Sequence, residues 1–300
     1  MEDEIARALK GERRALARVL SAIENGTFSL NDISSHDDSK INNMQWNTMA
    51  ITGAPGVGKS VLVDALMTQW ANQGHRIALL AVDPSSPRTG GALLGDRVRM
   101  TSVDNPKIKD QIYIRSLATR DASGSVPIIV EDMAAFLHSC GWQRVLIETV
   151  GSGQSELRCA AVADRIIVVE GPARGDGIQA EKAGLLELAD AVLVNKADLE
   201  GAQKHALELQ ESFTLGQTEA PPVLLTSGLQ GIGIETAAEL LFGLKASGRA
   251  TRARMRERLL AHHERRLVTH PSYNECLDRL TEGTIDIVKA LSIIQGEDYE

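Results

Sequence analysis

The 300-residue sequence lacks the features that mark a membrane-spanning, secreted or nucleic-acid-binding protein. No apolar run is long enough to span a bilayer, and the chain starts with the acidic segment Met1-Glu2-Asp3-Glu4 rather than with an apolar signal core. The formal net charge is −8, which argues against a dedicated nucleic-acid binder. We therefore expect a cytoplasmic protein with neither a membrane segment nor a nucleic-acid partner.

Cysteine is also scarce. Cys140, Cys159 and Cys276 are odd in number and lie far apart, so they do not form the pattern of a disulfide framework or of a cysteine metal site. We expect reduced thiols that fill space in the interior. The rest of the composition, 43% hydrophobic and 24% charged, allows one sizeable α/β domain with additions.

The most informative segment is a glycine-rich loop that matches the phosphate-binding pattern G-x-x-x-x-G-K-[ST]. Residues 46–52 resemble a strand, and apolar spacing over 61–70 predicts a helix, so the loop has the strand and helix that the motif requires. Glycines let backbone N–H groups face phosphate oxygens, Lys59 would reach the β- and γ-phosphates, and Ser60 would bind Mg²⁺. The predicted nucleotide contacts are Gly53, Ala54, Pro55, Gly56, Val57, Gly58, Lys59, Ser60 and Val61.

Alternating strand and helix patterns predict an α/β fold with a mainly parallel central sheet flanked by helices. Several predicted strands are apolar throughout, as interior strands of such a sheet are, and ligand loops are then expected beyond the carboxyl ends of the strands. The predicted strands lie near 47–53, 76–83, 112–116, 144–149, 165–170, 190–195 and 222–226.

Three segments are predicted along the chain. Residues 1–46 combine an amphipathic helix over 5–25 with a polar connection, and residues 47–248 form the nucleotide-binding domain. Residues 249–300 start with an arginine-rich run, continue as a helix to about residue 270, and resume after Pro271 as a helix over 272–291. This helical arm would dimerise by burying one face against a partner subunit; a solvated helix face is an equally good interpretation of the arginine run, and a nucleic-acid arm is a weaker one.

A second motif, Asn195-Lys196-Ala197-Asp198, indicates which base is bound. It ends a predicted strand and matches the N-K-x-D pattern of guanine-specific GTPases. Asp198 would accept hydrogen bonds from guanine N1–H and N2–H₂, a pair that adenine does not offer. Asn195 would tie this loop to the phosphate loop, and the Lys196 stem would lie along the base. The next strand ends near Ser227 and Gly228, where a backbone N–H would reach guanine O6; the alternative is an ATPase in which the motif is an accidental turn.

Acidic residues at other strand ends are candidates for the magnesium side of the site. Glu148 would hold a Mg²⁺-bound water, while Asp83 would contact such a water or orient the attacking one, unless it is a turn or capping residue. Asp96 is a further candidate near the metal. Gly151 would offer its N–H to the γ-phosphate, and Gln154 would position water, with helix capping or packing as its alternative. The predicted catalytic set is thus Lys59, Asp83, Glu148 and Gln154, and the predicted metal set is Ser60, Asp83, Asp96 and Glu148.

Together these motifs resemble the MeaB/ArgK family of P-loop GTPases, which includes methylmalonyl-CoA mutase-associated chaperones and is grouped with nickel-enzyme and signal-recognition GTPases. The resemblance covers nearly the whole chain and is most specific in 82–86, 89–100, 148–156 and the guanine motif, with 11–18 in the expected place. It implies a homodimeric, magnesium-dependent GTPase that binds an adenosylcobalamin-dependent acyl-CoA mutase, gates cofactor delivery, and protects or reactivates the mutase. A cobalamin adenosyltransferase is a further partner that the resemblance implies.

Departures from the family pattern fall where a mutase is expected to bind. Residues 121–126 replace a Gly-His-Leu-Gly-Gly-type run, and Ser152 replaces a valine. The segment that resembles the partner-signalling switch has Gly177 in place of an acidic residue. The client is therefore open among relatives of methylmalonyl-CoA mutase that act on isobutyryl-, hydroxyisobutyryl- or ethylmalonyl-CoA. Four switch residues match the family: Gly175, Asp176, Gln179 and Lys182.

Three other functions have to be compared with this one. A scaffold without turnover is disfavoured by the complete set of phosphate and magnesium residues. A nickel metallochaperone would carry histidine and cysteine ligands near the nucleotide, but His262-His263 is the only adjacent histidine pair and no cysteine lies near another. A kinase for a small molecule such as arginine would need a substrate pocket and ATP, which the guanine motif opposes. No residue in the sequence has the features of a strong catalytic base, so we expect slow intrinsic turnover that a partner accelerates.

Overall fold

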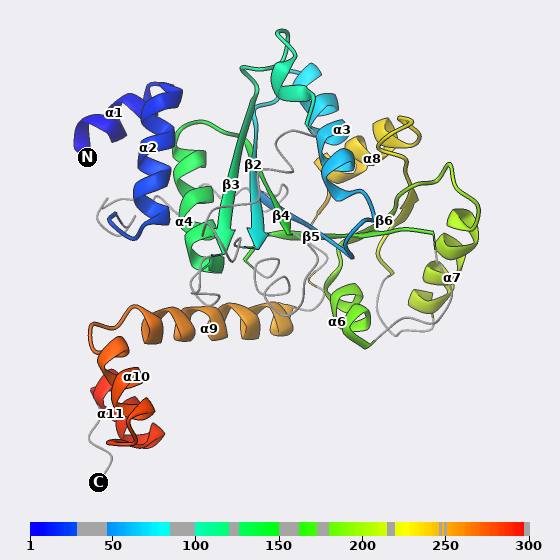
Figure 1. The fold of residues 1–300 in the computed structure, drawn as a ribbon. Coiled ribbons are helices and arrows are strands. Elements are labelled where there is room, and N and C mark those ends of the chain that lie inside the picture. The colour runs from blue at the N-terminus through cyan, green and yellow to red at the C-terminus, as the bar shows by residue number, and fades with distance from the viewer. Residues whose placement is uncertain are drawn as a thin grey trace.

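The computed structural model describes residues 1–28, 47–84, 100–119, 126–149, 162–172, 180–214, 220–245, 248 and 251–296. Within them, a seven-stranded sheet has the order β3-β2-β4-β1-β5-β6-β7, and every pair of neighbouring strands is parallel (Figure 1). All seven predicted strands are confirmed to within a few residues. Their bounds are β1 Thr48–Thr52, β2 Ile77–Pro84, β3 Ile112–Thr119, β4 Arg144–Thr149, β5 Arg165–Glu170, β6 Ala191–Val194 and β7 Val223–Leu225.

Helices cover both faces of the sheet, as the apolar strands require. Successive strand residues point to opposite faces, so Met49 and Ile51 of β1 belong to one apolar cluster while Ala50 belongs to the other. The first cluster is completed by α3 Lys59–Asn72, the 3-10 helix η4 Ser102–Asp104 and α8 Ile234–Phe242. The second is completed by α4 Val126–Ser139, α6 Ala180–Leu188 and α7 Ala202–Thr214, together with the N-terminal helices.

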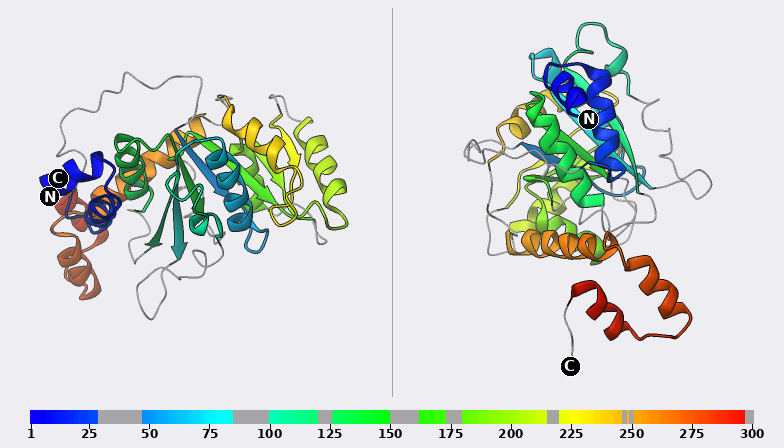
Figure 2. Two further views of the ribbon diagram at one scale, coloured as in Figure 1. Left: turned by 90° about the horizontal axis from the view of Figure 1, so that it is seen from above. Right: turned by 90° about the vertical axis from the view of Figure 1, so that its left-hand side faces the viewer.

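The predicted single helix over 5–25 is wrong, because the chain forms two helices, α1 Glu2–Leu9 and α2 Arg13–Glu24. Gly11 interrupts them with a φ of 91°, a conformation that favours glycine. Arg7 and Glu12 form an ion pair of 2.5 Å across the break. Apolar residues of α2 then pack on α4, so this extension is part of the body of the protein (Figure 2).

The C-terminal segment contains three helices, α9 Thr251–Val268, α10 Tyr273–Thr281 and α11 Ile287–Gln295. The helix predicted over 272–291 is therefore two helices. Gly283 has a φ of 69°, and Asp286 caps α11 by accepting a hydrogen bond from the Lys289 N–H at 2.7 Å. Figures 1 and 2 show α9 lying along the body, whereas α10 and α11 extend away from it.

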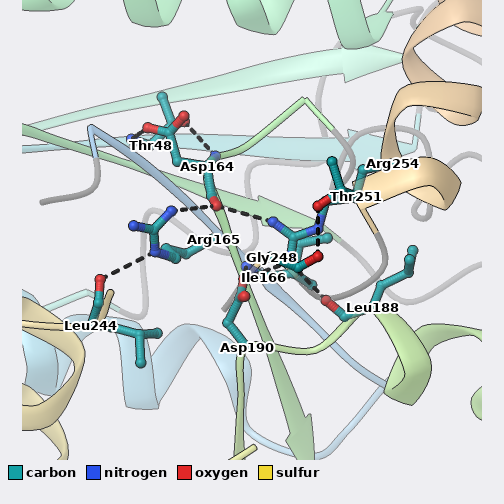
Figure 3. A network of polar contacts seen from close by, with 10 residues as sticks. All are labelled: Thr48, Asp164, Arg165, Ile166, Leu188, Asp190, Leu244, Gly248, Thr251 and Arg254. Atoms are coloured by element: carbon teal, nitrogen blue, oxygen red, sulfur yellow. Dashed lines mark hydrogen bonds and ion pairs between the residues drawn. The ribbon is translucent and has the colours of Figure 1, made fainter. Parts of the chain in front are cut away.

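The arginine run of α9 is attached to the core rather than only solvated. Arg254 donates to Asp190 Oδ2 at 2.6 Å and to the carbonyl oxygens of Leu188 and Asp164 (Figure 3). Asp190 in turn accepts the Ile166 N–H at 2.8 Å, so one buried carboxylate joins the arm to the start of β5. Two further ion pairs join Arg258 to Glu131 and Arg265 to Asp132, both acids of α4.

Among the helices of the described ranges, none has the length and apolarity needed to cross a membrane. The predicted segment limits 1–46, 47–248 and 249–300 stay a prediction.

Candidate nucleotide-binding site

The glycine-rich loop joins the carboxyl end of β1, an interior strand, to the start of α3, as the motif requires. Two of its glycines are required by close contacts. A Cβ on Gly53, whose φ is 147°, would lie 2.0 Å from the Val169 carbonyl oxygen. A Cβ on Gly58, whose φ is 92°, would lie 2.7 Å from Asn195 Nδ2. Only glycine fits these positions, and the turn they allow leaves the first N–H groups of the 14-residue helix α3 at the loop.

Lys59 is the first residue of α3, and only 7% of it is exposed. Its ammonium group donates hydrogen bonds to the Gly53 carbonyl oxygen at 2.7 Å and to the Ala54 carbonyl oxygen at 3.1 Å. The lysine stem therefore crosses the inside of the loop. A positive charge held there, beside the N-terminus of a helix, is suited to a polyphosphate.

Ser60 and Glu148 meet beside the loop. The Ser60 hydroxyl donates to Glu148 Oε1 at 2.7 Å, and Glu148 is 4% exposed. The contact follows from the sheet, because β4 pairs with β1 and Glu148 lies opposite Ile51 in the register. A hydroxyl and a carboxylate are hard oxygen donors of the kind that Mg²⁺ prefers, so these two residues fit a magnesium site.

The predicted tie between the guanine motif and the phosphate loop is confirmed. Asn195, which is 3% exposed, donates from Nδ2 to the Val57 carbonyl oxygen at 2.9 Å. Lys196 has a φ of 61° and donates to the Gly56 carbonyl oxygen at 2.7 Å. Both side chains therefore fasten the β6–α7 loop to the glycine-rich loop.

Asp198 and the loop after β7 lie next to one another. Asp198 is exposed, and its Oδ1 accepts a hydrogen bond from the buried Ser227 hydroxyl at 2.5 Å. The Gly228 N–H, which sequence reasoning directs at guanine O6, donates to Asn195 Oδ1 at 3.1 Å. A Cβ on Gly228 would lie 2.9 Å from Leu62 Cα, so the loop can pack on α3 at this distance only with a glycine there.

Sequence reasoning missed Asp64, one helical turn after Ser60. Its carboxylate is 8% exposed and accepts four hydrogen bonds, from the backbone N–H and the hydroxyl of both Thr101 and Ser102. The chain preceding these two residues includes the predicted magnesium-side residue Asp96. The i,i+4 spacing from Ser60 was the available signal, because it places the two side chains on the same side of α3.

Several predicted site residues cannot be placed in the same way. Asp83 lies in β2 and Lys182 in α6, but only their backbone is described. The others fall outside the described residues: Asp96, Gly151, Gln154, Gly175, Asp176 and Gln179, together with Ser152, Gly177 and 121–125 of the departures.

The parallel sheet, the glycine-rich loop after β1 and the Asn195–Asp198 loop beside it define a P-loop nucleotide-binding protein with a guanine-type base loop. The family model of the methylmalonyl-CoA mutase-associated GTPase MeaB matches residues 16–281. The chain therefore belongs to the MeaB family and is a P-loop GTPase that binds guanine nucleotide.

Curated relatives agree with the family. A GTPase of Pyrococcus horikoshii is 37% identical over 243 residues, which cover 78% of this chain and 74% of that protein. The GTPase ArgK of Escherichia coli is 30% identical over 308 residues, 96% of this chain and 91% of the relative. The fused isobutyryl-CoA mutase of Cupriavidus metallidurans is 36% identical over 197 residues, 64% of this chain but only 18% of that longer protein.

Among solved structures, the crystal structure of a LAO/AO transport system kinase covers 98% of this chain and 96% of its own, with a TM-score of 0.62 and 22% identity. At that identity the likeness supports the fold, and the kinase activity in its name is not carried over to this chain.

Proposed function

We propose that this protein is a GTP-hydrolysing chaperone of an adenosylcobalamin-dependent acyl-CoA mutase, with cofactor delivery to the mutase gated by the nucleotide state. The observation that carries the proposal is the match to a segment of the fused isobutyryl-CoA mutase, since a GTPase and a mutase joined in one polypeptide would act side by side. The family description, which associates its members with methylmalonyl-CoA mutase, supports the same client class.

The proposed roles start with the phosphates. Backbone N–H groups over 53–60 and the Lys59 ammonium would hold the β- and γ-phosphates and oppose the negative charge that builds up as the terminal phosphoryl group leaves. The hydrogen bonds from Lys59 to Gly53 and Ala54 support this, because they place the ammonium inside the loop.

Base selection would depend on Asp198. Its carboxylate is oriented by Ser227, and Lys196 spans the gap to the phosphate loop. Asn195 would keep the two loops at a fixed separation, which sets the distance between base and phosphates. Adenine would leave the Asp198 carboxylate facing an acceptor at N1, so the loop is expected to disfavour ATP.

Ser60 and Glu148 would hold the magnesium ion, Ser60 directly and Glu148 through a bound water, with Asp83 and Asp96 as the remaining proposed acids. When bound, the ion would neutralise part of the negative charge of the phosphates. The Glu148 carboxylate, fixed by the Ser60 hydroxyl at 2.7 Å, supports this arrangement. Gln154 remains the proposed residue for positioning water, and Gly151 for sensing the γ-phosphate.

Asp64 would connect the start of α3 to the segment around residue 101. It is one turn from Ser60 on α3 and holds Thr101 and Ser102 by four hydrogen bonds. A shift of the start of α3 would therefore move Asp64 and, through its hydrogen bonds, residues 101 and 102. We propose that the switch residues Gly175, Asp176, Gln179 and Lys182 respond to the same nucleotide states and signal them to the mutase and to a cobalamin adenosyltransferase.

The protein is proposed to act as a homodimer through α10 and α11. Each of these helices has nine residues, and within the described part of the chain they bury little beyond Cys276, Ala290 and Ser292. Helices this short are marginal without tertiary packing. Leu277, Ile287 and Val288 are exposed at 43%, 69% and 61%, which gives a second copy an apolar surface to cover. Light scattering at several concentrations would test the dimer, with Ile287→Glu as the disrupting variant and Glu282→Gln as the control.

The chaperone proposal is tested by phosphate release from GTP during titration with purified acyl-CoA mutases. For a switch, the two nucleotide states should differ in mutase affinity by about 1–3 kcal/mol, or roughly 5–150-fold. Lys59→Ala should keep its circular dichroism spectrum, lose turnover and still bind a mutase in pull-down. Equal GTPase rates and equal affinities in both nucleotide states, for every acyl-CoA mutase tested to saturation, would refute gating.

A further inference from the structure

A cavity lies at the edge of the sheet opposite the nucleotide loops. Its volume is about 240 Å³, and it is lined by Ala8, Gly11, Arg13, Leu16, Arg76, Asp110, Cys140 and Trp142. Arg76, Asp110 and Trp142 come just before β2, β3 and β4, whereas the glycine-rich loop follows β1. Because all these strands are parallel, their amino ends lie at one edge and the nucleotide loops at the other.

Two arginines share one aromatic ring in this cavity. The guanidinium carbon of Arg76 lies 4.5 Å from the centroid of Trp142, and that of Arg13 lies 5.7 Å from it. Contacts of this kind orient the planar groups without using up their N–H donors. Arg13 donates through Nη2 to the Lys109 and Ile112 carbonyl oxygens, and Arg76 through Nη1 to the Gly141 carbonyl oxygen. Within the described part of the chain, neither arginine forms an ion pair, so donors of both remain for a ligand.

The other lining residues define the kind of anion. Asp110 is the single acid of the lining, and burial raises the pKa of the Cys140 thiol to about 11, so the thiol is neutral. Two arginines against one carboxylate leave one net positive charge, which suits a monoanion. Leu16 and Trp142 are 3% and 2% exposed and form apolar walls. The Trp142 indole N–H is buried without a hydrogen-bond partner among the described residues, a condition that calls for an explanation.

We propose that this cavity binds a small organic monocarboxylate, with the carboxylate on Arg13 and Arg76 and the apolar part against Leu16 and Trp142. A guanidinium matches a carboxylate with two parallel hydrogen bonds, and the apolar walls exclude a fully hydrated ion. A phosphate dianion would bring more charge than the lining neutralises. The cavity is smaller than typical drug-sized pockets, so the ligand is a short-chain acid. Its place at the amino ends of the strands, opposite the phosphate loop, separates it from the nucleotide.

The test uses the full-length protein with GDP and Mg²⁺ at saturation, so that anion binding at the phosphate loop does not contribute. Butyrate is titrated and followed by saturation-transfer NMR, with butyramide as the uncharged probe and inorganic phosphate as the inorganic one. We expect saturable butyrate binding and no butyramide binding. Arg76→Gln should weaken butyrate at least about tenfold through the loss of a charged hydrogen-bond pair, whereas Arg14→Gln, an exposed neighbour outside the lining, should leave it unchanged.

Four results would overturn the proposal. The first two are the absence of a saturable butyrate signal, and butyramide binding as tightly as butyrate. The other two are Arg76→Gln binding butyrate as tightly as wild type, and phosphate binding the wild type as tightly as butyrate does. The comparison of butyrate with butyramide uses the unaltered chain, so it decides the matter even if Arg76→Gln does not fold.

Discussion

The prediction with the most direct structural basis is that Asp198→Asn changes the base that the protein prefers. In the proposed complex, the Asp198 carboxylate would present two acceptor oxygens to the two adjacent donors of guanine. In the variant, the amide NH₂ would face the guanine N2–H₂, so a donor would meet a donor. Ser227 can still donate to the remaining amide oxygen, as it does to Asp198 Oδ1 at 2.5 Å, and Asp198 is exposed, so the fold should be unaffected.

A hydrogen bond to a charged group contributes roughly 1.5–3 kcal/mol. In Asp198→Asn one such bond would be lost and two donors would face each other. The free energy of GTP binding should therefore become less favourable by about 3–4 kcal/mol, which raises Kd by two to three orders of magnitude. Xanthosine triphosphate carries an oxygen where guanine carries its amine, so the amide can donate to it and the variant should prefer it to GTP.

Isothermal titration calorimetry with both nucleotides, on wild type and on Asp198→Asn, measures this exchange. Glu200→Gln removes an exposed charge two residues away and should leave both affinities unchanged. The reasoning is refuted if Asp198→Asn binds GTP within about threefold of wild type, or if it shows no preference for xanthosine triphosphate.

Three other predictions concern packing, the helical arm and pH. Gly228→Ala should lower the free energy of unfolding by about 1–3 kcal/mol and weaken GTP binding, because its Cβ would lie 2.9 Å from Leu62 Cα. Gly184→Ala, where a Cβ meets nothing within 4 Å, is the control in urea unfolding. Equal effects of the two substitutions would contradict the packing argument. Arg254→Leu should lower the free energy of unfolding by about 3 kcal/mol, because it removes the cation paired with buried Asp190. Arg252→Leu should change it by under about 0.5 kcal/mol. Similar losses in the two variants would show that the Arg254–Asp190 ion pair does not specifically hold α9 on the core. Burial lowers the pKa of His138, so the unfolded chain takes up a proton more readily below about pH 6.5 and stability falls with acidification; His138→Asn should flatten that fall in thermal unfolding from pH 8 to 5, and an unchanged slope would contradict it.

The strands of the sheet could be predicted closely because their sequence signal is local and strong. Ile77 to Val82 is apolar without interruption, and the residues are buried in β2 between β3 and β4. The phosphate and guanine loops were predictable for a related reason, since each requires particular residue types at fixed spacing right after a strand.

Helix breaks and long-range ion pairs were harder to foresee. The apolar pattern over 5–25 continues across Gly11, so periodicity alone did not reveal that its backbone ends α1. The sequence pattern of the α9 arginines fitted a partner-binding face and a solvated face equally well. It did not reveal their ion pairs, because the partners Asp190, Glu131 and Asp132 lie 60 or more residues away in sequence. Asp64 was missed because its role depends on Thr101 and Ser102, which only the tertiary fold brings to α3.

The central claim is that a magnesium-bound guanine nucleotide occupies the loop of Lys59 and Ser60 and is recognised through Asp198. Calorimetric titration of the wild-type protein with GTP and with ATP, each with Mg²⁺, tests it most directly. GTP should bind at least about a hundredfold more tightly than ATP, because adenine forgoes two hydrogen bonds to the carboxylate. Equal affinity for the two nucleotides would contradict it.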